Sequence, residues 1–244
     1  KIAELLLHSA PGLPRILADD IRRQRRFPSA PAATPTGRTR AFFKIQDGCD
    51  AFCSYCIVPY TRGPSCSLPL SGVLDGARNF IARGFREIVL TGIHLGDYGR
   101  DLKPATSLTS ALVGLLSQNP TARFRLSSIE PNEISDELLA LSGHYRNLCP
   151  HLHIPLQSGD DDILKSMKRR YDTAFYRDLL DRVTRTWADA AIGIDVLVGF
   201  PGEGEKEFRH TVELLEKLPA AYLHVFPYSE RPGTAALAIH PKVP

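Results

Sequence analysis

From Arg40 onward, short apolar runs alternate with longer segments in which apolar residues recur every three or four positions. Short runs that are apolar on both faces are typical of parallel strands covered by helices, and the longer segments are typical of amphipathic helices. This pattern predicts strands at residues 41–46, 87–91, 123–128, 151–156, 192–198 and 222–226. It predicts helices near residues 70–83, 106–117, 135–142, 160–168, 173–187 and 205–217.

Two of the predicted helices show the helical period clearly. Their apolar stripes consist of Phe175, Leu179, Val183 and Trp187 in the first, and of Phe208, Val212 and Leu215 in the second. Asp172 precedes the first of them as a predicted N-cap. Strand–helix repeats without long antiparallel hairpins favour a parallel, curved sheet. Six repeats rather than eight predict an α/β fold of the open (β/α)6 type, a partial TIM-like barrel.

The first part of the chain follows a different pattern. Prolines recur through residues 11–35, with Ala, Ser and Thr between them, so regular structure is not expected there. We interpret residues 1–37 as the tail of a preceding domain plus a linker, and residues 38–244 as the core domain. The first residue is Lys1 rather than Met, which suggests a fragment of a longer protein.

Composition narrows the class of protein only a little. The 244 residues are 43% hydrophobic, which is enough for a sizeable core, and the net charge of +3 does not by itself indicate a nucleic-acid binder. Basic residues cluster at 22–26 and at 168–170, where they could contact phosphates or form a solvated surface. No apolar run approaches the roughly 18 residues that a membrane-spanning helix needs.

Three cysteines carry the clearest chemical signal. Cys49, Cys53 and Cys56 follow the first predicted strand, at the carboxyl end of the sheet where barrel active sites form. Three thiolates can hold three irons of a cubane cluster and leave the fourth iron open to another ligand. The alternative is a structural zinc site, which needs four ligands; only Cys66 and distant histidines could complete it.

The spacing Cys-x3-Cys-x2-Cys resembles the signature of the radical S-adenosylmethionine (SAM) superfamily. The flanking motifs resemble, more narrowly, the methylthiotransferases that modify tRNA. These motifs are Lys-Ile-Gln-Asp-Gly-Cys at 44–49, Leu-Thr-Gly-Ile-His-Leu-Gly at 90–96, Ser-Ser-Ile-Glu-Pro at 127–131, His-Ile-Pro-Leu-Gln-Ser-Gly at 153–159, Gly-Phe-Pro-Gly-Glu at 199–203 and Phe-Pro-Tyr-Ser at 226–229. The first two are most similar to the enzymes that act on N6-threonylcarbamoyladenosine beside the anticodon.

This resemblance implies a cofactor set. Cys49, Cys53 and Cys56 would bind a 4Fe–4S cluster, whose open iron in this superfamily chelates the amino and carboxylate groups of SAM. One electron then cleaves a carbon–sulfur bond and releases a 5′-deoxyadenosyl radical. We assign no catalytic residue beyond these three ligands.

The residues expected to bind SAM lie beside the third cysteine or at strand ends. They are Tyr55, Thr91, Gly92, Ser128, Glu130, Gln157, Val198 and Gly199. Tyr55 takes the place where the superfamily sets an aromatic residue by the adenine, and Thr91 and Gly92 the place where backbone groups meet the methionine amino group. Several have simpler interpretations: the glycines as ordinary turns, and Glu130 as a helix cap or the partner of a nearby arginine.

The remaining polar residues are less informative. Arg62 could support the cluster, contact RNA or lie exposed, and Arg169 and Arg170 are candidate phosphate contacts. We expect His94, His151 and His153 to be hydrogen-bonded structural residues rather than metal ligands. Cys66 departs from the family, which usually has Arg in this stretch; Cys149 is expected to be a small buried hydrophobe.

The resemblance predicts that the chain is the radical SAM core of an enzyme that adds a methylthio group to C2 of N6-threonylcarbamoyladenosine. Isopentenyladenosine in tRNA or a ribosomal protein are alternative substrates, and a non-catalytic, zinc-stabilised RNA-binding module is the alternative of another class. The family implies a tRNA anticodon stem-loop as partner, an electron donor such as flavodoxin or ferredoxin, and a cytoplasmic location. It also implies an N-terminal domain with a second 4Fe–4S cluster and a C-terminal RNA-binding domain that residues 1–244 do not contain, so this chain should not complete methylthiolation alone.

Overall fold

The computed structural model describes residues 20–23, 27 and 39–243. Most of the predicted tail and linker, residues 1–37, therefore lies outside the described residues, and the domain boundary stays a prediction. Within residues 1–37, the structure describes residues 20–23 and 27, which include the short 3-10 helix η1 (Ile21–Arg23).

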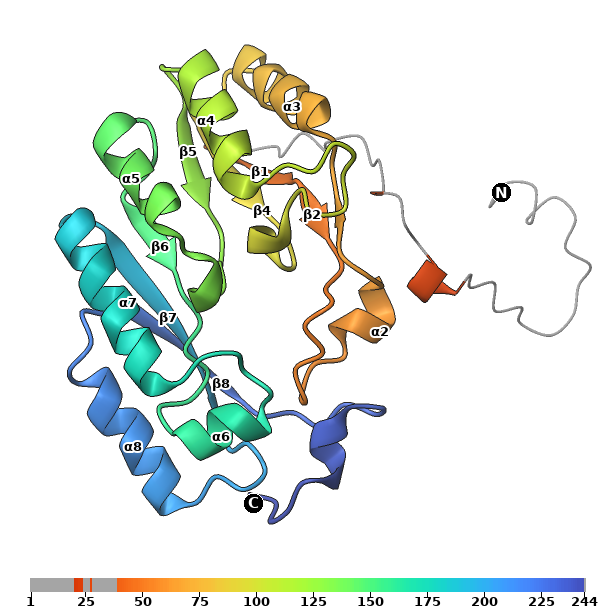
Figure 1. Ribbon diagram of the computed structural model, residues 1–244, viewed down its shortest axis with the longest axis vertical. Coiled ribbons are helices and arrows are strands. Elements are labelled where there is room, and N and C mark those ends of the chain that lie inside the picture. Colours follow the sequence, from red (N-terminus) through yellow and green to blue (C-terminus); the bar gives the residue numbers. More distant parts are fainter. Residues whose placement is uncertain (1–19, 24–26, 28–38, 244) are drawn as a thin grey trace, which may run out of the picture.

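Six parallel strands form the sheet of the core domain, and this confirms the predicted open barrel (Figure 1). The strands are β1 (Arg40–Lys44), β4 (Glu87–Thr91), β5 (Arg123–Leu126), β6 (His151–His153), β7 (Ala191–Val198) and β8 (Tyr222–Pro227). They pair in the orders β1-β4-β5 and β6-β7-β8, and isolated bridges such as Ser128 to His153 connect β5 with β6. Among the described strands β1 and β8 do not pair, so both are edges and the barrel stays open.

Helices cover the outer face of this sheet (Figure 1). They are α3 (Leu70–Ala82), α4 (Leu108–Gln118), α5 (Asp136–His144), α7 (Thr173–Thr186) and α8 (Glu205–Leu215), and the shorter α6 (Asp161–Ser166) follows β6. The four helices α4 to α7 begin after a Ser or Asp whose side chain accepts hydrogen bonds from backbone N–H groups of the first turn: Ser107, Ser135, Asp160 and Asp172. The predicted cap at Asp172 is therefore confirmed.

The predicted apolar stripes are partly wrong. In α7 the buried residues are Tyr176, Leu179, Leu180 and Val183, whereas Phe175 is exposed. A constant spacing of four residues drifts around a helix of 3.6 residues per turn, so residues one position away share the buried face. In α8 only Thr211 and Leu214 are buried, and Phe208 is exposed.

Two strand ends and one small motif also differ from the prediction. β6 ends at His153, although Ile154 and Leu156 still donate their N–H groups to the carbonyls of Gly193 and Asp195 in β7. The first predicted strand is divided into β1 and a short β2 (Gln46–Asp47), which pairs antiparallel with β3 (Cys66–Ser67). Such two-residue strands show no period, so the sequence pattern carried no signal for them; α2 (Val58–Arg62), in the loop between them, was missed as well.

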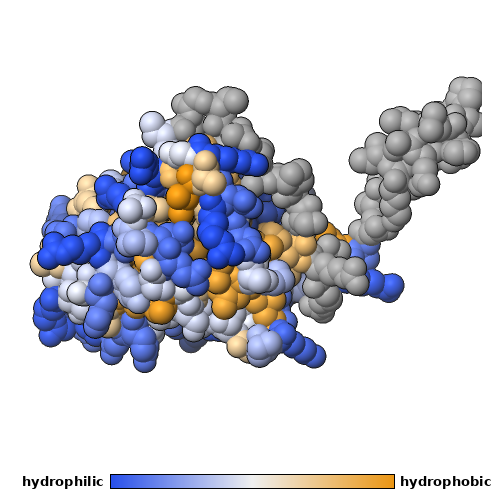
Figure 2. Space-filling view, turned by 90° about the horizontal axis from the view of Figure 1, so that it is seen from above, coloured by the Kyte–Doolittle hydropathy of each residue, from blue (hydrophilic) through white to orange (hydrophobic). Residues whose placement is uncertain are grey.

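No helix among the described residues is long and apolar enough to cross a membrane. Figure 2 shows hydrophilic residues over much of the drawn face, with hydrophobic side chains gathered in patches near the middle of the view.

The helix α3 packs directly on β1 through a glycine. A Cβ atom at Gly76 would lie 2.3 Å from Cζ of Phe43, and the Phe43 ring is backed by Phe80 with ring centroids 5.4 Å apart. The contact therefore leaves no room for a side chain at position 76.

We predict that Gly76→Ala lowers the free energy of unfolding by about 1–3 kcal/mol, because the added methyl group overpacks this contact. Gly143 is the matched control: it lies in α5, and a Cβ atom there would have no atom within 4 Å beyond its chain neighbours and the backbone of its own helix. Gly143→Ala should stabilise by about 0.5–1 kcal/mol through helix propensity. Urea unfolding of both variants tests this, and equal shifts of the same sign would contradict the packing argument.

Candidate functional site

A single buried side chain, Gln46, fixes the start of the cysteine loop. Its Nε2 atom donates to the carbonyl oxygens of Asp47 (2.9 Å) and Gly48 (2.8 Å) and to Oγ of Ser65 (3.0 Å). Its Oε1 atom accepts from the backbone N–H of His94 at 2.8 Å. Gln46 therefore joins both ends of the loop to the end of β4. It stands in one of the motifs singled out above, but nothing in the pattern indicated this role.

The loop presents three free thiols, Cys49, Cys53 and Cys56, each partly exposed. Among the described residues these cysteines do not form a group of three ligand atoms within 4.8 Å of one another. A tetrahedral zinc site with Zn–S bonds of about 2.3 Å requires sulfur atoms only about 3.8 Å apart. The three thiols are therefore not arranged as a preformed zinc site, and this three-sulfur donor set fits the larger Fe–S cubane.

The other two cysteines are placed elsewhere. Cys66 lies buried in β3, opposite Asp47, and Cys149 is buried at 1% exposure, as the sequence predicted. Burial raises the pKa of both thiols, which keeps them protonated and poor metal ligands.

His94 contacts the first cysteine. Its Nδ1 atom lies 3.4 Å from Sγ of Cys49, and its Nε2 atom lies 2.6 Å from Oε1 of Glu133. Burial lowers the pKa of His94, but the contacts with Cys49, Glu133 and Asp97 outweigh it and raise that pKa to about 11. His94 is thus a hydrogen-bonded residue, as expected, but one that touches the candidate cluster ligand.

Arg169 contacts the second cysteine, Cys53, as His94 contacts the first. Its Nη1 atom donates to Sγ of Cys53 at 3.4 Å and lies 3.5 Å from the hydroxyl of Tyr55, and its Nη2 atom pairs with Glu130. Only 3% of the Arg169 side chain is exposed. This placement corrects the expectation that Arg169 contacts RNA phosphate, because its guanidinium is buried and already occupied.

The same contact decides between two interpretations of Glu130. The side chain makes no cap hydrogen bond to the 3-10 helix η3 (Pro131–Glu133) and pairs with Arg169 instead. Burial raises the pKa of Glu130, and the Arg169 and His94 charges oppose that rise. The carboxylate thereby holds Arg169 against the cysteine loop.

Tyr55 forms a group of aromatic rings with Phe200 and Tyr228, and Val198 and Gly199 directly precede Phe200 in the chain. The ring of Tyr55 meets Phe200 edge to face, with centroids 6.3 Å apart, and Phe200 meets Tyr228 at 5.7 Å. Gly199 has a φ of +75° and donates its N–H to Glu203, a conformation that suits glycine. A cavity of about 800 Å³ opens beside Val198 and Gly199, and its lining includes no residue of the cysteine loop.

The remaining predicted SAM-binding residues lie at strand ends. Gly92 lies against Gln46, and the carbonyl of Thr91 accepts from Ile45 N–H at 2.9 Å. Ser128 is exposed and bridges to His153, while Gln157 has a φ of +69°. A left-handed conformation is costly for a residue with a side chain and is often retained at functional sites.

The other basic candidates remain on the surface. Arg62 is 54% exposed, and its Nε atom lies 3.8 Å from Oδ1 of Asp47. Lys168 and Arg170 are exposed beside the cysteine loop, where both line a small cavity with Cys53 and His94. Their contact with RNA stays a prediction.

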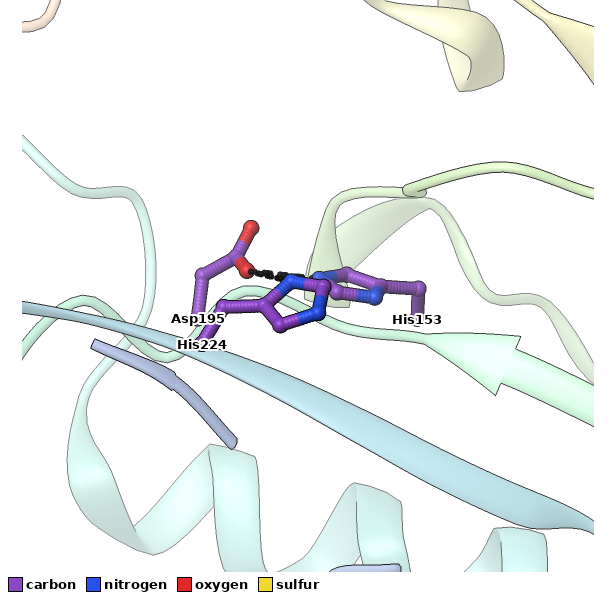
Figure 3. A group of neighbouring side chains, drawn as sticks. All are labelled: His153, Asp195 and His224. Carbon is purple, nitrogen blue, oxygen red and sulfur yellow. Dashed lines mark hydrogen bonds and ion pairs between the residues drawn. The ribbon is translucent and has the colours of Figure 1, made fainter. Parts of the chain in front are cut away.

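A second polar cluster lies on β6, β7 and β8 (Figure 3). Asp195 Oδ1 accepts from His153 Nε2 at 2.7 Å, and His224 Nδ1 lies 3.3 Å from the same oxygen. The hydroxyl of Tyr222 lies 3.1 Å from His153 Nδ1 and 2.7 Å from His151 Nε2. The sequence pattern did not lead us to Asp195, Tyr222 or His224; the charge of Asp195 inside an otherwise apolar strand was the available signal.

Comparison with known proteins shows the family to which this fold belongs. The family model of the Radical SAM superfamily matches residues 43–215. The chain is 40% identical over 209 residues to the Threonylcarbamoyladenosine tRNA methylthiotransferase MtaB of Rickettsia prowazekii, covering 85% of this chain and 49% of that protein. It is 39% identical over 218 residues to the tRNA-2-methylthio-N(6)-dimethylallyladenosine synthase of Erythrobacter litoralis, covering 87% and 49%. The chain thus spans about half the length of these relatives.

Solved structures share the fold at lower identity. The radical S-adenosylmethionine methyltransferase TsrM of Kitasatospora setae matches with a TM-score of 0.68 at 17% identity, over 80% of this chain and 38% of that one. Coproporphyrinogen III oxidase (HemN) of Escherichia coli matches with a TM-score of 0.60 at 19% identity, over 87% and 50%.

We predict that Arg169→Met lowers the midpoint potential of a reconstituted cluster by on the order of tens of millivolts, because a cationic donor to Cys53 is lost. The neighbouring Arg170→Met removes an exposed charge and is the control, with a much smaller effect expected. A redox titration followed by electron paramagnetic resonance measures both. Equal potentials in wild type and Arg169→Met would show that this contact does not tune the cluster.

The second cluster predicts a pH effect on stability. Burial, with nearby Arg125 and His153, lowers the pKa of His151 to about 4. The unfolded chain binds a proton at His151 near pH 6.5 and the folded chain does not, so stability should fall as the pH drops from about 6.5 towards 4.

We predict that His151→Gln flattens this part of the stability curve by on the order of 1 kcal/mol, a value reduced for partial solvent exposure. His144→Gln, at the exposed end of α5, is the control. Thermal unfolding from pH 7.5 to 4.5 gives the slopes; an unchanged slope in His151→Gln would refute the assignment.

Proposed function

The chain belongs to the Radical SAM superfamily, and from this premise we propose that it is the catalytic core of an enzyme that adds a methylthio group to tRNA. The observation that carries the proposal is the loop that sets three free thiols at the mouth of an open barrel, two of them in contact with His94 and Arg169. The tRNA methylthiotransferases among its relatives support the reaction class.

We further propose C2 of N6-threonylcarbamoyladenosine, beside the anticodon, as the position modified. Relatives named for this nucleoside match at 40% and 41% identity. A second candidate is the dimethylallyladenosine nucleoside, because two synthases named for it match at 39%. The motifs at 44–49 and 90–96 favour the first.

A bound 4Fe–4S cluster and SAM would together supply the carbon radical that can attack an aromatic C–H bond, which no side-chain base is strong enough to deprotonate. In this proposal Cys49, Cys53 and Cys56 hold the cluster. Tyr55, Val198 and Gly199 bind the adenosyl part of SAM, and Thr91 and Gly92 lie by its amino group. Ser128, Glu130 and Gln157 provide polar contacts at the strand ends, with Glu130 acting through Arg169.

The partners follow from this activity. Arg62 and Arg170 are the exposed arginines that would contact the anticodon stem-loop, and a flavodoxin or ferredoxin would supply electrons. In this proposal a second 4Fe–4S cluster would be held by residues outside the 244 described by this sequence. Such an enzyme would work in the cytoplasm, where tRNA is modified.

The test is anaerobic reconstitution with iron and sulfide, followed by strong reduction in the presence of SAM. We expect roughly four irons per chain and release of 5′-deoxyadenosine. Cys53→Ser should abolish both, whereas Cys66→Ser and Cys149→Ser, which change thiols away from the loop, should retain both. Iron-loaded wild type that releases no 5′-deoxyadenosine would overturn the proposal, as would stoichiometric zinc in place of iron.

A further inference from the structure

The edge strand β8 presents a row of three rings on one face. Tyr222, His224 and Phe226 alternate along the strand, with centroids 5.2 Å apart for the first pair and 6.2 Å for the second. His224 is 52% exposed at its side chain and Phe226 is 51% exposed, while Tyr222 is more covered. We call these three residues the β8 ring row.

The ring row lies on the face of the sheet turned away from the helices. In the pairing of β7 with β8, Asp195 stands opposite His224, and the buried Ile194 and Val196 stand opposite Leu223 and Val225. Because side chains alternate along a strand, Leu223 and Val225 lie on the helix-covered side and the ring row lies on the inner side. Figure 1 shows the helices on the outside of these strands.

The Tyr222 end of the ring row is held in place by contacts with β6 and β7. A Cβ atom at Gly193 would lie 2.2 Å from Cζ of Tyr222, so the glycine leaves the space in which the Tyr222 ring crosses β7. The Tyr222 hydroxyl then reaches His151 and His153 on β6, and Asp195 connects His153 with His224. The rings are thus positioned before any ligand arrives, which lowers the entropic cost of binding.

The Phe226 end of the ring row lies towards the proposed SAM-binding residues. Phe226 pairs with Leu197, and Tyr228, two residues on, donates its N–H to the carbonyl of Val198 at 2.7 Å. Tyr228 contacts Phe200, which contacts Tyr55 beside Cys56. A flat group on His224 and Phe226 would therefore lie on the strand that leads to the cofactor site.

The same atoms could also be considered for a metal ion, since one ligand atom each of His153, Asp195 and His224 lie within 4.8 Å of one another. However, Asp195 Oδ1 already accepts from His153 at 2.7 Å, a distance typical of a direct hydrogen bond. An ion would have to break this bond. The exposed rings, by contrast, are what single-stranded RNA bases stack on.

We propose that the target purine of the RNA stacks on the exposed ring of His224 and meets Phe226 edge to face, since these two rings lie at 74° to each other, with the Asp195 carboxylate facing the polar edge of the base. This inference rests on the proposed RNA substrate and assigns the surface that receives the base. The inner face of β8 supplies the stacking area, and Asp195 supplies a hydrogen-bond acceptor beside it.

The test compares two versions of one anticodon stem-loop RNA, one with adenosine and one with an abasic residue at the target position. Fluorescence anisotropy at fixed low salt gives Kd for the full chain. Wild type should bind the adenosine RNA more tightly, and the double variant His224→Ala/Phe226→Ala should lose about tenfold in affinity for that RNA only. The double variant Leu223→Ala/Val225→Ala, on the other face of the same strand, should leave both affinities unchanged.

The outcomes separate the two proposals. If wild type binds both RNAs equally, binds neither, or loses the same affinity in both double variants, the stacking surface is wrong. Stoichiometric Zn²⁺ or Mn²⁺ binding that is lost in Asp195→Asn would also overturn it in favour of a metal site. Release of 5′-deoxyadenosine is measured without RNA and decides the proposed function independently.

Discussion

Three thiols lie on one short loop, and the arrangement of the residues around that loop depends on them. Bound to a cluster, these sulfurs carry negative charge, and burying it requires positive partners with good hydrogen-bond geometry. His94 and Arg169 provide them at Cys49 and Cys53, and each cation is itself held by a carboxylate, Glu133 and Glu130. Removing one member of such a group would leave an uncompensated buried charge, so the pairs are mutually dependent.

The backbone around the loop also helps to hold the three thiols in position. Gln46 uses both ends of its amide to join the loop to β4, and the loop then returns through the small β2–β3 pair. Gly48 is needed where the chain turns, because a Cβ there would lie 2.0 Å from the carbonyl oxygen of Pro64. The sulfurs are therefore oriented by ordinary amide hydrogen bonds before any cofactor binds.

An open barrel leaves two edge strands, and an exposed edge invites unwanted pairing with other chains. In β8 five of the six residues are exposed, which is unusual for a strand of an α/β core. Its two faces differ in chemistry: aliphatic side chains lie on the outer face, and rings with a hydrogen-bonded network lie on the inner face. The open side of the barrel is thus the place where a large substrate can reach the interior.

The sequence alone predicted the parallel open barrel, which the structure confirms, and the loop that carries the three candidate cluster ligands. Strand and helix periods depend on residues close in the chain, and the cysteine spacing lies within eight positions, so both are local properties. Only the tertiary structure decided what those residues contact. It placed Arg169 in the interior against Cys53 and Glu130 rather than on an RNA surface, although its neighbour Arg170 is exposed and the two are indistinguishable by composition. It also brought His153, Asp195 and His224 together from three strands. The charge of Asp195 in an apolar strand marked that residue, but its partners depend on the pairing register between distant segments.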